Sequence, residues 1–264
     1  MELSPRFALH SSPMSPQVTV SVVSHNQAAL VGNLLSDLHL HCTAISKIVL
    51  TINIEEPVPF DMAQFKFPIE VVRNPVAKGF GANHNAAFKL AKTDYFCVLN
   101  PDVRMTRDPF PALLEQLRDP SAGVAAPRIL DSAGNVENSA RKFPTPFSIL
   151  KKALFGVRAP DYETGATPIF PDWVGGMFMV FRSEAFRAVG GFDERYFLYY
   201  EDVDICWRMH RRGFRAVLVP AVSVVHDARR SSHRDPRYLV WHLTSMLRFF
   251  CARSGGQFTR RDQK

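Results

Sequence analysis

Short β-branched runs alternate with segments of helical periodicity through the first half of the chain. The run Val18–Val23 is followed by Leu30, Leu34 and Leu38 at helical spacing, which predicts a strand, a turn and a helix. Further strands are predicted at residues 47–54, 69–72, 95–99 and 123–129, with helices at about 82–91 and from 108 onward. Strands that alternate with helices favour right-handed crossovers, so the sequence predicts an α/β fold with a mostly parallel central sheet flanked by helices.

The second half of the chain is less regular. Residues 131–171 contain five prolines and little periodicity, and we therefore expect a long excursion or lid over the functional site. Two short strands are expected around Pro220, at 216–219 and 222–225, and a last helix at about 238–250.

Length and composition restrict the class of protein. With 264 residues, of which 46% are hydrophobic and 22% charged, the chain can bury a core, which excludes disorder throughout. The cysteines, Cys42, Cys97, Cys206 and Cys251, show no Cys-x-x-Cys spacing, which favours reduced cytosolic thiols over disulfides or a zinc site. Residues 1–16 lack the apolar stretch of a signal peptide and are expected to form a mobile leader, so we expect a cytoplasmic location.

Positive charge is concentrated towards the C-terminal end. The net charge of the chain is +7, and residues 208–264 carry thirteen Lys or Arg against three Asp or Glu. Such a segment suits an anionic membrane, a nucleic acid or a phosphorylated substrate, and charge alone does not choose among them. The helix at 238–250 has an apolar face, which suits either peripheral contact with an anionic membrane or packing on the core with its arginines in solvent.

Two adjacent acids, Glu201 and Asp202, follow the aromatic cluster Tyr196–Tyr200. Aromatic rings reduce the hydration of a carboxylate, and a second carboxylate opposes double ionisation, so both effects raise a pKa towards that of a useful general base. Either acid is therefore a candidate catalytic base. The same acids also suit the start of a helix that runs to Arg212 and ends before Gly213, where negative charge is stabilising whatever the chemistry.

Asn100-Pro101-Asp102 follows the apolar strand at 95–99 and places a carboxylate at the carboxyl end of the sheet, where ligands of such folds bind. A hard divalent cation prefers oxygen ligands and commonly bridges one or two carboxylates to substrate phosphates. His226, at another strand end, would add a nitrogen ligand and shift the preference from Mg towards Mn. The same residues also suit a turn and a strand-end histidine bonded to the backbone, and spacing leaves both interpretations open.

The segment Lys78–Asn85 is a glycine-containing turn that leads into the N-terminus of a helix. Free backbone amides at a helix N-terminus, next to a lysine, suit a phosphate or sugar hydroxyls, although the glycines equally suit a simple turn. Gly175-Gly176 and Gly190-Gly191 would let a ligand approach the backbone closely, or would likewise only turn the chain.

Together these segments resemble family 2 glycosyltransferases, most closely the bacterial rhamnosyltransferase-like branch. The resemblance covers roughly residues 18–250, and the ordered set is far more specific than any one member. Its motifs are Lys78-Gly79-Phe80-Gly81-Ala82-Asn83, Asn100-Pro101-Asp102-Val103, Gly175-Gly176-Met177-Phe178-Met179, Gly190-Gly191-Phe192-Asp193-Glu194, Tyr199-Tyr200-Glu201-Asp202-Val203-Asp204-Ile205-Cys206-Trp207-Arg208 and the strand that ends in His226. It implies a GT-A fold with a Rossmann-related sheet, a nucleotide-diphosphate sugar donor, a glycan or lipid-linked acceptor, a divalent cation (Mg or Mn) and inversion at the anomeric carbon.

Carried over by position, the resemblance implies a role for each motif. It puts the catalytic base on Asp202, paired with Glu201. It puts the metal on Asp102, with His226 as a further ligand, although Asn100 stands where many relatives have a first Asp. Relatives often have Asp-Asn-x-Ser where this chain has Thr-Ile-Asn-Ile-Glu, so Asn53 is the substitute expected to meet the nucleobase. The donor is expected to meet Ser24, His25, Asn26, Asn53, Lys78, Gly79, Phe80, Asn83, Asn100 and Asp102. The acceptor is expected to meet Trp173, Gly175, Gly176, Met177 and Tyr200.

We therefore expect one GT-A domain at residues 17–250 and a basic tail at 251–264. Residues 17–130 would form the nucleotide-sugar half and residues 172–236 the half that holds the acceptor and the base, with both acids, Asp102 and Asp202, facing one cleft. The expected activity is sugar transfer from dTDP-rhamnose or a UDP-sugar, in bacterial cell-surface polysaccharide synthesis.

The alternative is a non-catalytic module that binds a nucleotide sugar or a nucleic acid. The basic C-terminal segment shows no recognised nucleic-acid motif and few aromatic residues spaced for base stacking, so we expect no nucleic-acid partner.

Overall fold

The computed structural model describes residues 17–156, 160–227 and 236–254. The predicted leader at 1–16 and most of the predicted tail, from 255 onward, lie outside these residues.

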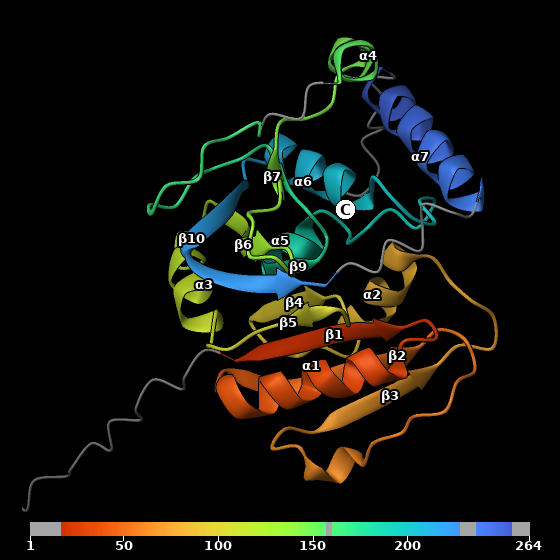
Figure 1. Ribbon diagram of the computed structural model, residues 1–264, viewed down its shortest axis with the longest axis vertical. Coiled ribbons are helices and arrows are strands. Elements are labelled where there is room, and N and C mark those ends of the chain that lie inside the picture. The colour runs from red at the N-terminus through yellow and green to blue at the C-terminus, as the bar shows by residue number, and fades with distance from the viewer. Residues whose placement is uncertain (1–16, 157–159, 228–235, 255–264) are drawn as a thin grey trace, which may run out of the picture.

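The described residues form an eight-stranded sheet in the order β3-β2-β1-β4-β9-β6-β10-β5 (Figure 1). Its N-terminal part is parallel, as predicted, because β1 pairs with β2 and β4, and β2 pairs with β3, all in the same direction. The strands of this part are β1 (Val18–Ser24), β2 (Ile45–Ile52), β3 (Ile69–Arg73) and β4 (Tyr95–Leu99).

An antiparallel strand, β9 (Phe178–Arg182), lies between β4 and β6 (Ala122–Leu130), and the sequence analysis did not predict it. In this register Leu99 pairs with Phe178, and the Asn100 amide donates to the Met177 carbonyl at 2.9 Å. The chain that leaves β4 at Asn100-Pro101-Asp102 is thereby held next to the chain that enters β9 from Gly175-Gly176. The sheet thus joins two motifs that are far apart in the sequence.

The two short strands predicted around Pro220 are one long strand, β10 (Arg215–His226), which runs parallel to β6. The pairing register shifts between Val219 and Ser223, so the residues around Pro220 are accommodated as an irregularity. Proline has no N–H for the ladder and is tolerated at such bulges, which explains why the strand continues past it. At its end β10 pairs antiparallel with β5 (Val103–Arg104), which places His226 beside Val103.

Helices cover both faces of the sheet. One hydrophobic cluster joins the sheet to α1 (Ala28–His41) and α3 (Phe110–Gln116). A second cluster joins the other face to α2 (Phe80–Phe88), α5 (Ser183–Ala188) and α6 (Glu201–Arg211). The predicted end of α2 at residue 91 is wrong by three residues, because the amides of Leu90 and Ala91 bond three residues back, in a tighter turn.

The predicted excursion at 131–171 contains ordered structure. Its strand β7 (Ala140–Arg141) pairs with β8 (Trp173–Val174), and it carries the helix α4 (Pro146–Phe155). The last helix, α7 (Pro236–Ser254), is longer than predicted, and α4 and α7 lie at the same end of the molecule (Figure 1). A single turn of 3-10 helix, Met62–Gln64, completes the elements. None of the helices in the described part of the chain is long and apolar enough to cross a membrane.

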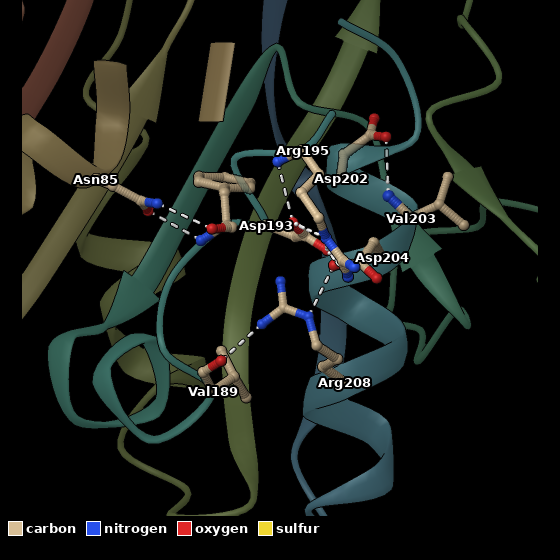
Figure 2. A network of polar contacts seen from close by, with 9 residues as sticks. Asn85, Val189, Asp193, Arg195, Asp202, Val203, Asp204 and Arg208 are labelled. Atoms are coloured by element: carbon tan, nitrogen blue, oxygen red, sulfur yellow. Dashed lines mark hydrogen bonds and ion pairs between the residues drawn. The ribbon is translucent and has the colours of Figure 1, made fainter. Parts of the chain in front are cut away.

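Polar contacts hold the start of α6 in place (Figure 2). Asn85 of α2 exchanges two hydrogen bonds with the backbone of Phe192, at 2.8 and 2.9 Å. Arg208 of α6 bonds Asp204 at 2.7 Å and the Val189 carbonyl at 2.6 Å. The turn after α5 is therefore tied to both helices, and the chain enters α6 in a fixed direction.

Candidate functional site

A cavity of about 750 Å³ lies at the carboxyl ends of β1, β2 and β4, where the sequence predicted donor binding. Its lining includes every predicted donor residue except Ser24 and Gly79, which are buried behind it. The lining also includes Phe197, Leu198 and three residues of α7, namely Arg237, Tyr238 and Trp241. No pattern in the sequence associated α7 with the donor, because the contact joins residues more than a hundred positions apart.

The Asn53 side chain has its hydrogen-bonding capacity filled by protein groups. Its oxygen accepts from the Lys78 amide and from Asn74, both at 2.8 Å. Its nitrogen donates to the Lys78 carbonyl at 3.0 Å and to His25 Nδ1 at 3.1 Å. Because an amide side chain offers two donors and two acceptor positions, any contact of Asn53 with a nucleobase would have to break one of these bonds.

The same contacts define the state of the His25 ring. The two bonds to the Lys78 backbone fix which end of the Asn53 amide is nitrogen, since a backbone amide donates and a carbonyl accepts. His25 Nδ1 therefore accepts a hydrogen bond from the Asn53 amide, so the N–H of the ring lies on Nε2. His25 is exposed in the cavity wall and can offer that N–H to a ligand.

His84 is a cavity residue that the sequence analysis did not single out, although it lies within the predicted glycine-turn segment. Its Nδ1 lies 2.8 Å from Ser21 Oγ on β1, and burial lowers the pKa of the imidazole to about 3. His84 is therefore neutral and fixed by the sheet beneath it.

The glycine turn before α2 has a packing role. The Phe80 amide donates to the Phe197 carbonyl at 2.9 Å, and the Lys78 amide is bonded to Asn53. A Cβ at Gly79 would lie 2.7 Å from the Phe197 oxygen, and one at Gly81 would lie 2.7 Å from Phe192 Cβ. Two of the amides expected to cradle a phosphate are thus bonded within the protein, and the glycines allow close contact with the segment before α6.

Asp102, His226 and Glu137 form a chain of contacts at the edge of the donor cavity. His226 Nε2 lies 3.4 Å from Asp102 Oδ1, and its Nδ1 lies 3.2 Å from Glu137 Oε2. Burial lowers the pKa of His226, but the neighbouring carboxyl groups of Asp102 and Glu137 outweigh it, so the pKa is raised. Asp102 Oδ1 is buried and accepts no hydrogen bond in the described residues. No group of three or more acidic, histidine or cysteine side chains in that part of the chain is arranged to enclose a metal ion.

A second cavity, of about 520 Å³, is lined by Glu201 and Asp202, the predicted catalytic acids, and by the predicted acceptor residues Trp173 and Tyr200. Gly175, Gly176 and Met177 do not line it. Its other walls come from the excursion, through Arg141–Thr145 and α4, and from His242 of α7. The excursion therefore covers Asp202 rather than the donor cavity.

Asp202 is held by two backbone amides. Its Oδ2 accepts from Gly176 at 3.1 Å and its Oδ1 from Val203 at 2.8 Å. Burial raises the pKa of Asp202, and these bonds and the charge of Arg141 only partly offset that effect. The amides at the start of the helix therefore lower the pKa of Asp202 less than desolvation raises it.

Glu201 is buried and its Oε2 has no partner in the described structure. Burial raises the pKa of Glu201 well above its ordinary value, and the charge of Asp202 raises it further. The adjacent acids thus have unequal surroundings, because two backbone amides stabilise charge on Asp202 and Glu201 Oε2 has no such donor among the described residues.

Strained backbone precedes the pair. Tyr199 and Tyr200 both adopt left-handed conformations, with φ of 70° and 67°. Such a conformation costs a non-glycine residue on the order of 1–3 kcal/mol, and it clusters at functional sites. Here it turns the chain sharply into α6, so that Asp202 meets the Gly176 amide.

The expectation of one cleft shared by Asp102 and Asp202 is not met, because the two acids line separate cavities. The cavities adjoin, since Phe197-Leu198 lines one and Tyr199-Tyr200 the other. Gly176 lies in the wall between them, where a Cβ would be 3.4 Å from Phe80 Cζ and 3.7 Å from Asp202 Oδ2.

Comparison with known proteins identifies relatives of this architecture. Residues 60–186 match the model of glycosyl transferase family 2. Over 179 residues, the chain is 35% identical to an N-acetylglucosaminyl-diphospho-decaprenol L-rhamnosyltransferase of Mycobacterium tuberculosis, covering 62% of this chain and 57% of that protein. It is 28% identical to the rhamnosyltransferase WbbL of Escherichia coli K12 over 248 residues, covering 88% of this chain and 92% of the relative.

Solved glycosyltransferases share the fold. GalNAc-T7 with UDP, GalNAc and Mn2+ superposes with a TM-score of 0.67 at 15% identity, covering 90% of this chain and 48% of the other. A mannosyltransferase from Pyrobaculum calidifontis with GDP-Man and Mn2+ gives 0.61 at 20% identity, covering 89% and 65%. These similarities establish the GT-A fold that the sequence predicted.

The Gly79 contact yields a prediction about stability. We expect Gly79→Ala to lower the free energy of unfolding by about 1–3 kcal/mol, because the added methyl group meets backbone atoms that cannot rotate away. Gly165→Ala is the matched control, since a Cβ there has open space around it and should change stability little. Urea denaturation of both variants measures the difference, and equal midpoints would contradict the packing role.

Proposed function

This chain belongs to glycosyltransferase family 2, and on that premise we propose that it transfers a sugar from a nucleotide-diphosphate donor to a lipid-linked or glycan acceptor, with inversion. The observation that carries the proposal is Asp202, a carboxylate of raised pKa held by two amides in the wall of a cavity that adjoins the donor cavity. The chain spans 57% of the length of the mycobacterial relative, so its activity and substrates are proposals.

Asp202 acts as the general base. The proton of an acceptor hydroxyl moves to the Asp202 carboxylate as the acceptor oxygen bonds to the anomeric carbon, and the bond from that carbon to the diphosphate breaks. The electron pair of that bond leaves with the nucleoside diphosphate, and attack from the opposite side inverts the configuration. The Gly176 and Val203 amides fix the direction of the carboxylate, which general-base catalysis requires.

Glu201 supports this base without sharing its role. Because it keeps its proton, it places no second negative charge beside Asp202. The pair thus carries one negative charge, on the Asp202 carboxylate. This carboxylate takes up the proton of the acceptor hydroxyl.

A divalent cation fits the residues at the edge of the donor cavity. Asp102 Oδ1 is a buried acceptor that has no hydrogen bond from the described residues, and His226 Nε2 lies 3.4 Å from it, so these two side chains would hold the ion. Such an ion is known to share its remaining positions with substrate phosphates and water. When bound, it would neutralise charge on the departing diphosphate.

The donor is proposed to be dTDP-rhamnose or a UDP-sugar. The His25 Nε2–H offers a hydrogen-bond donor in the cavity wall, which suits the ring carbonyl oxygens of uracil and thymine. The acceptor is proposed to be lipid-linked, as the name of the mycobacterial relative implies for that protein, and to serve cell-surface polysaccharide synthesis. Peripheral contact of α7 with an anionic membrane at the cytoplasmic side would bring enzyme and acceptor together.

A panel of UDP-, dTDP- and GDP-sugars, screened by thermal shift with and without Mn2+, tests the proposal at the level of binding. Transfer to a short-chain lipid-linked saccharide, with the anomeric configuration of the product read by NMR, tests it at the level of chemistry. Donor binding without transfer or donor hydrolysis would favour a non-catalytic module instead.

Substitution of Asp202, the proposed catalytic base, distinguishes its role in catalysis from a role in donor binding. We expect Asp202→Asn to lower the transfer rate by about two to four powers of ten while the donor's dissociation constant stays unchanged, because only the proton acceptor is lost. Glu201→Gln is the matched comparison, since glutamine resembles a protonated glutamate, and it should retain far more activity. Near-wild-type turnover of Asp202→Asn would refute the assignment.

The raised pKa of Asp202 sets the pH dependence. A base must be ionised, so kcat/KM should fall as the pH drops through the pKa of Asp202, at a midpoint above 3.8, its ordinary value. Arg141 lowers this pKa, and Arg141→Met should therefore move the acidic limb to higher pH. Profiles of both proteins measure the shift, and a shift to lower pH would contradict the assignment.

Removal of one oxygen ligand tests the cation. We expect Asp102→Asn to reduce the gain in melting temperature that Mn2+ gives in the presence of the preferred nucleoside diphosphate, with affinity falling about tenfold or more. Asp61→Asn is the control, because Asp61 is an exposed acid that caps a 3-10 turn outside the cavity. An equal Mn2+ response in Asp102→Asn and wild type would exclude Asp102 as a ligand.

A further inference from the structure

Exposed apolar side chains are concentrated on two helices. Of the thirteen large apolar side chains exposed in the described residues, eight lie on α4 and α7. The four on α4 are Phe147, Leu150, Leu154 and Phe155, with 55 to 76% of their surface exposed. A monomeric soluble protein rarely gathers such side chains in one region without a binding role.

The outer face of α7 is apolar in a regular way. Leu239, Leu243 and Leu247 recur every four residues and are 61, 44 and 60% exposed, and Val240 lies beside them. The inner face holds Ser245 and Phe249, which are buried, and Ser245 Oγ donates to the Leu198 carbonyl at 3.0 Å. The helix is thus anchored on one side, and its exposed stripe is not the side that packs on the core.

Charge on the two helices is of one sign. Neither α4 nor α7 contains an acidic residue, whereas Lys151, Arg237, Arg248 and Arg253 lie on them. The guanidinium groups of Arg248 and Arg253 donate to main-chain carbonyls, which leaves their positive charge unneutralised by those bonds.

The two helices also border the cavity that holds Asp202. Ser148 and Ile149 of α4 and His242 of α7 line that cavity. Arg253 near the end of α7 bonds the carbonyl of Pro144, two residues before α4 begins, at 3.1 Å. Figure 1 shows α4 and α7 together at one end of the molecule, beyond α6.

From these observations we propose that the outer faces of α4 and α7 together form a docking surface for an anionic lipid bilayer. This deepens the proposed function, because it rests on an acceptor carried by a lipid. Apolar side chains that enter the headgroup region, with basic groups and no acids around them, are the chemistry of interfacial helices. An acceptor head group rising from the bilayer would then meet the cavity of Asp202 between the two helices.

Vesicle binding of the full chain tests the surface directly. Wild type should co-sediment with vesicles of equal parts phosphatidylcholine and phosphatidylglycerol, and much less with phosphatidylcholine alone, because the helices carry only positive charge. The double variants Leu243→Glu/Leu247→Glu and Leu150→Glu/Leu154→Glu should each bind about tenfold more weakly or worse, since acidic groups replace apolar contacts. Leu40→Glu, on the exposed side of α1, is the control and should bind as wild type does.

Transfer assays separate this surface from the chemistry. Both double variants should transfer sugar to a short-chain, detergent-free acceptor at the wild-type rate, and lose transfer only to an acceptor embedded in vesicles. Vesicle binding requires no turnover, so it can succeed where the proposed function fails. The proposal is overturned if the wild-type protein does not bind anionic vesicles, or if the double variants bind them as tightly as wild type does. It is also overturned if the protein binds no lipid and sedimentation shows a dimer that these substitutions dissociate.

Discussion

The burial of two adjacent carboxyl groups at the start of α6 is the constraint on which the rest of the site depends. In water Glu201 and Asp202 would both ionise, but desolvation raises the pKa of each, and their proximity penalises a second charge. Asp202 accepts hydrogen bonds from two backbone amides, whereas Glu201 Oε2 has no partner among the described residues, so the surroundings stabilise negative charge on Asp202 more than on Glu201. The fold thereby gives two adjacent acids different surroundings.

This arrangement requires the surrounding fold to hold strained backbone. The antiparallel strand β9 delivers the Gly176 amide from one side, while Tyr199 and Tyr200 turn the chain in left-handed conformations from the other. Such strain persists only where neighbours fix the chain on both sides. Here Phe197 is bonded to the start of α2 and Leu198 to Ser245 of α7, while the polar contacts of Figure 2 fix the far end of the same segment.

How far the sequence predicted this structure depends on the range of each interaction. The strands β1 to β4 follow from local β-branched runs, and the motifs around Asp102 and Asp202 follow from their order along the chain. The insertion of β9 between β4 and β6 was not predicted, because strand partners are chosen by contacts across the whole fold. The bonds that occupy Asn53 come from residues 21 to 28 positions away, so its sequence neighbours gave no sign of them.

The sequence also could not predict that the two cavities are separate, because both are lined by the segment 197–200 and by α7, which lie far from the motifs around Asp102 in the sequence. Transfer requires the anomeric carbon to meet the acceptor oxygen in line, so a sugar whose diphosphate lies near Asp102 has to reach across the wall at Gly176. A glycine suits that place, because it adds no side chain between Phe80 and Asp202.

The helix α7 contributes consecutive residues, Trp241 and His242, to the two cavities and presents leucines on its outer face. A displacement of α7 would therefore change the walls of both cavities together. If lipid contact sets the position of this helix, then the arrival of a lipid-borne acceptor and the shape of the donor cavity are linked through a single element.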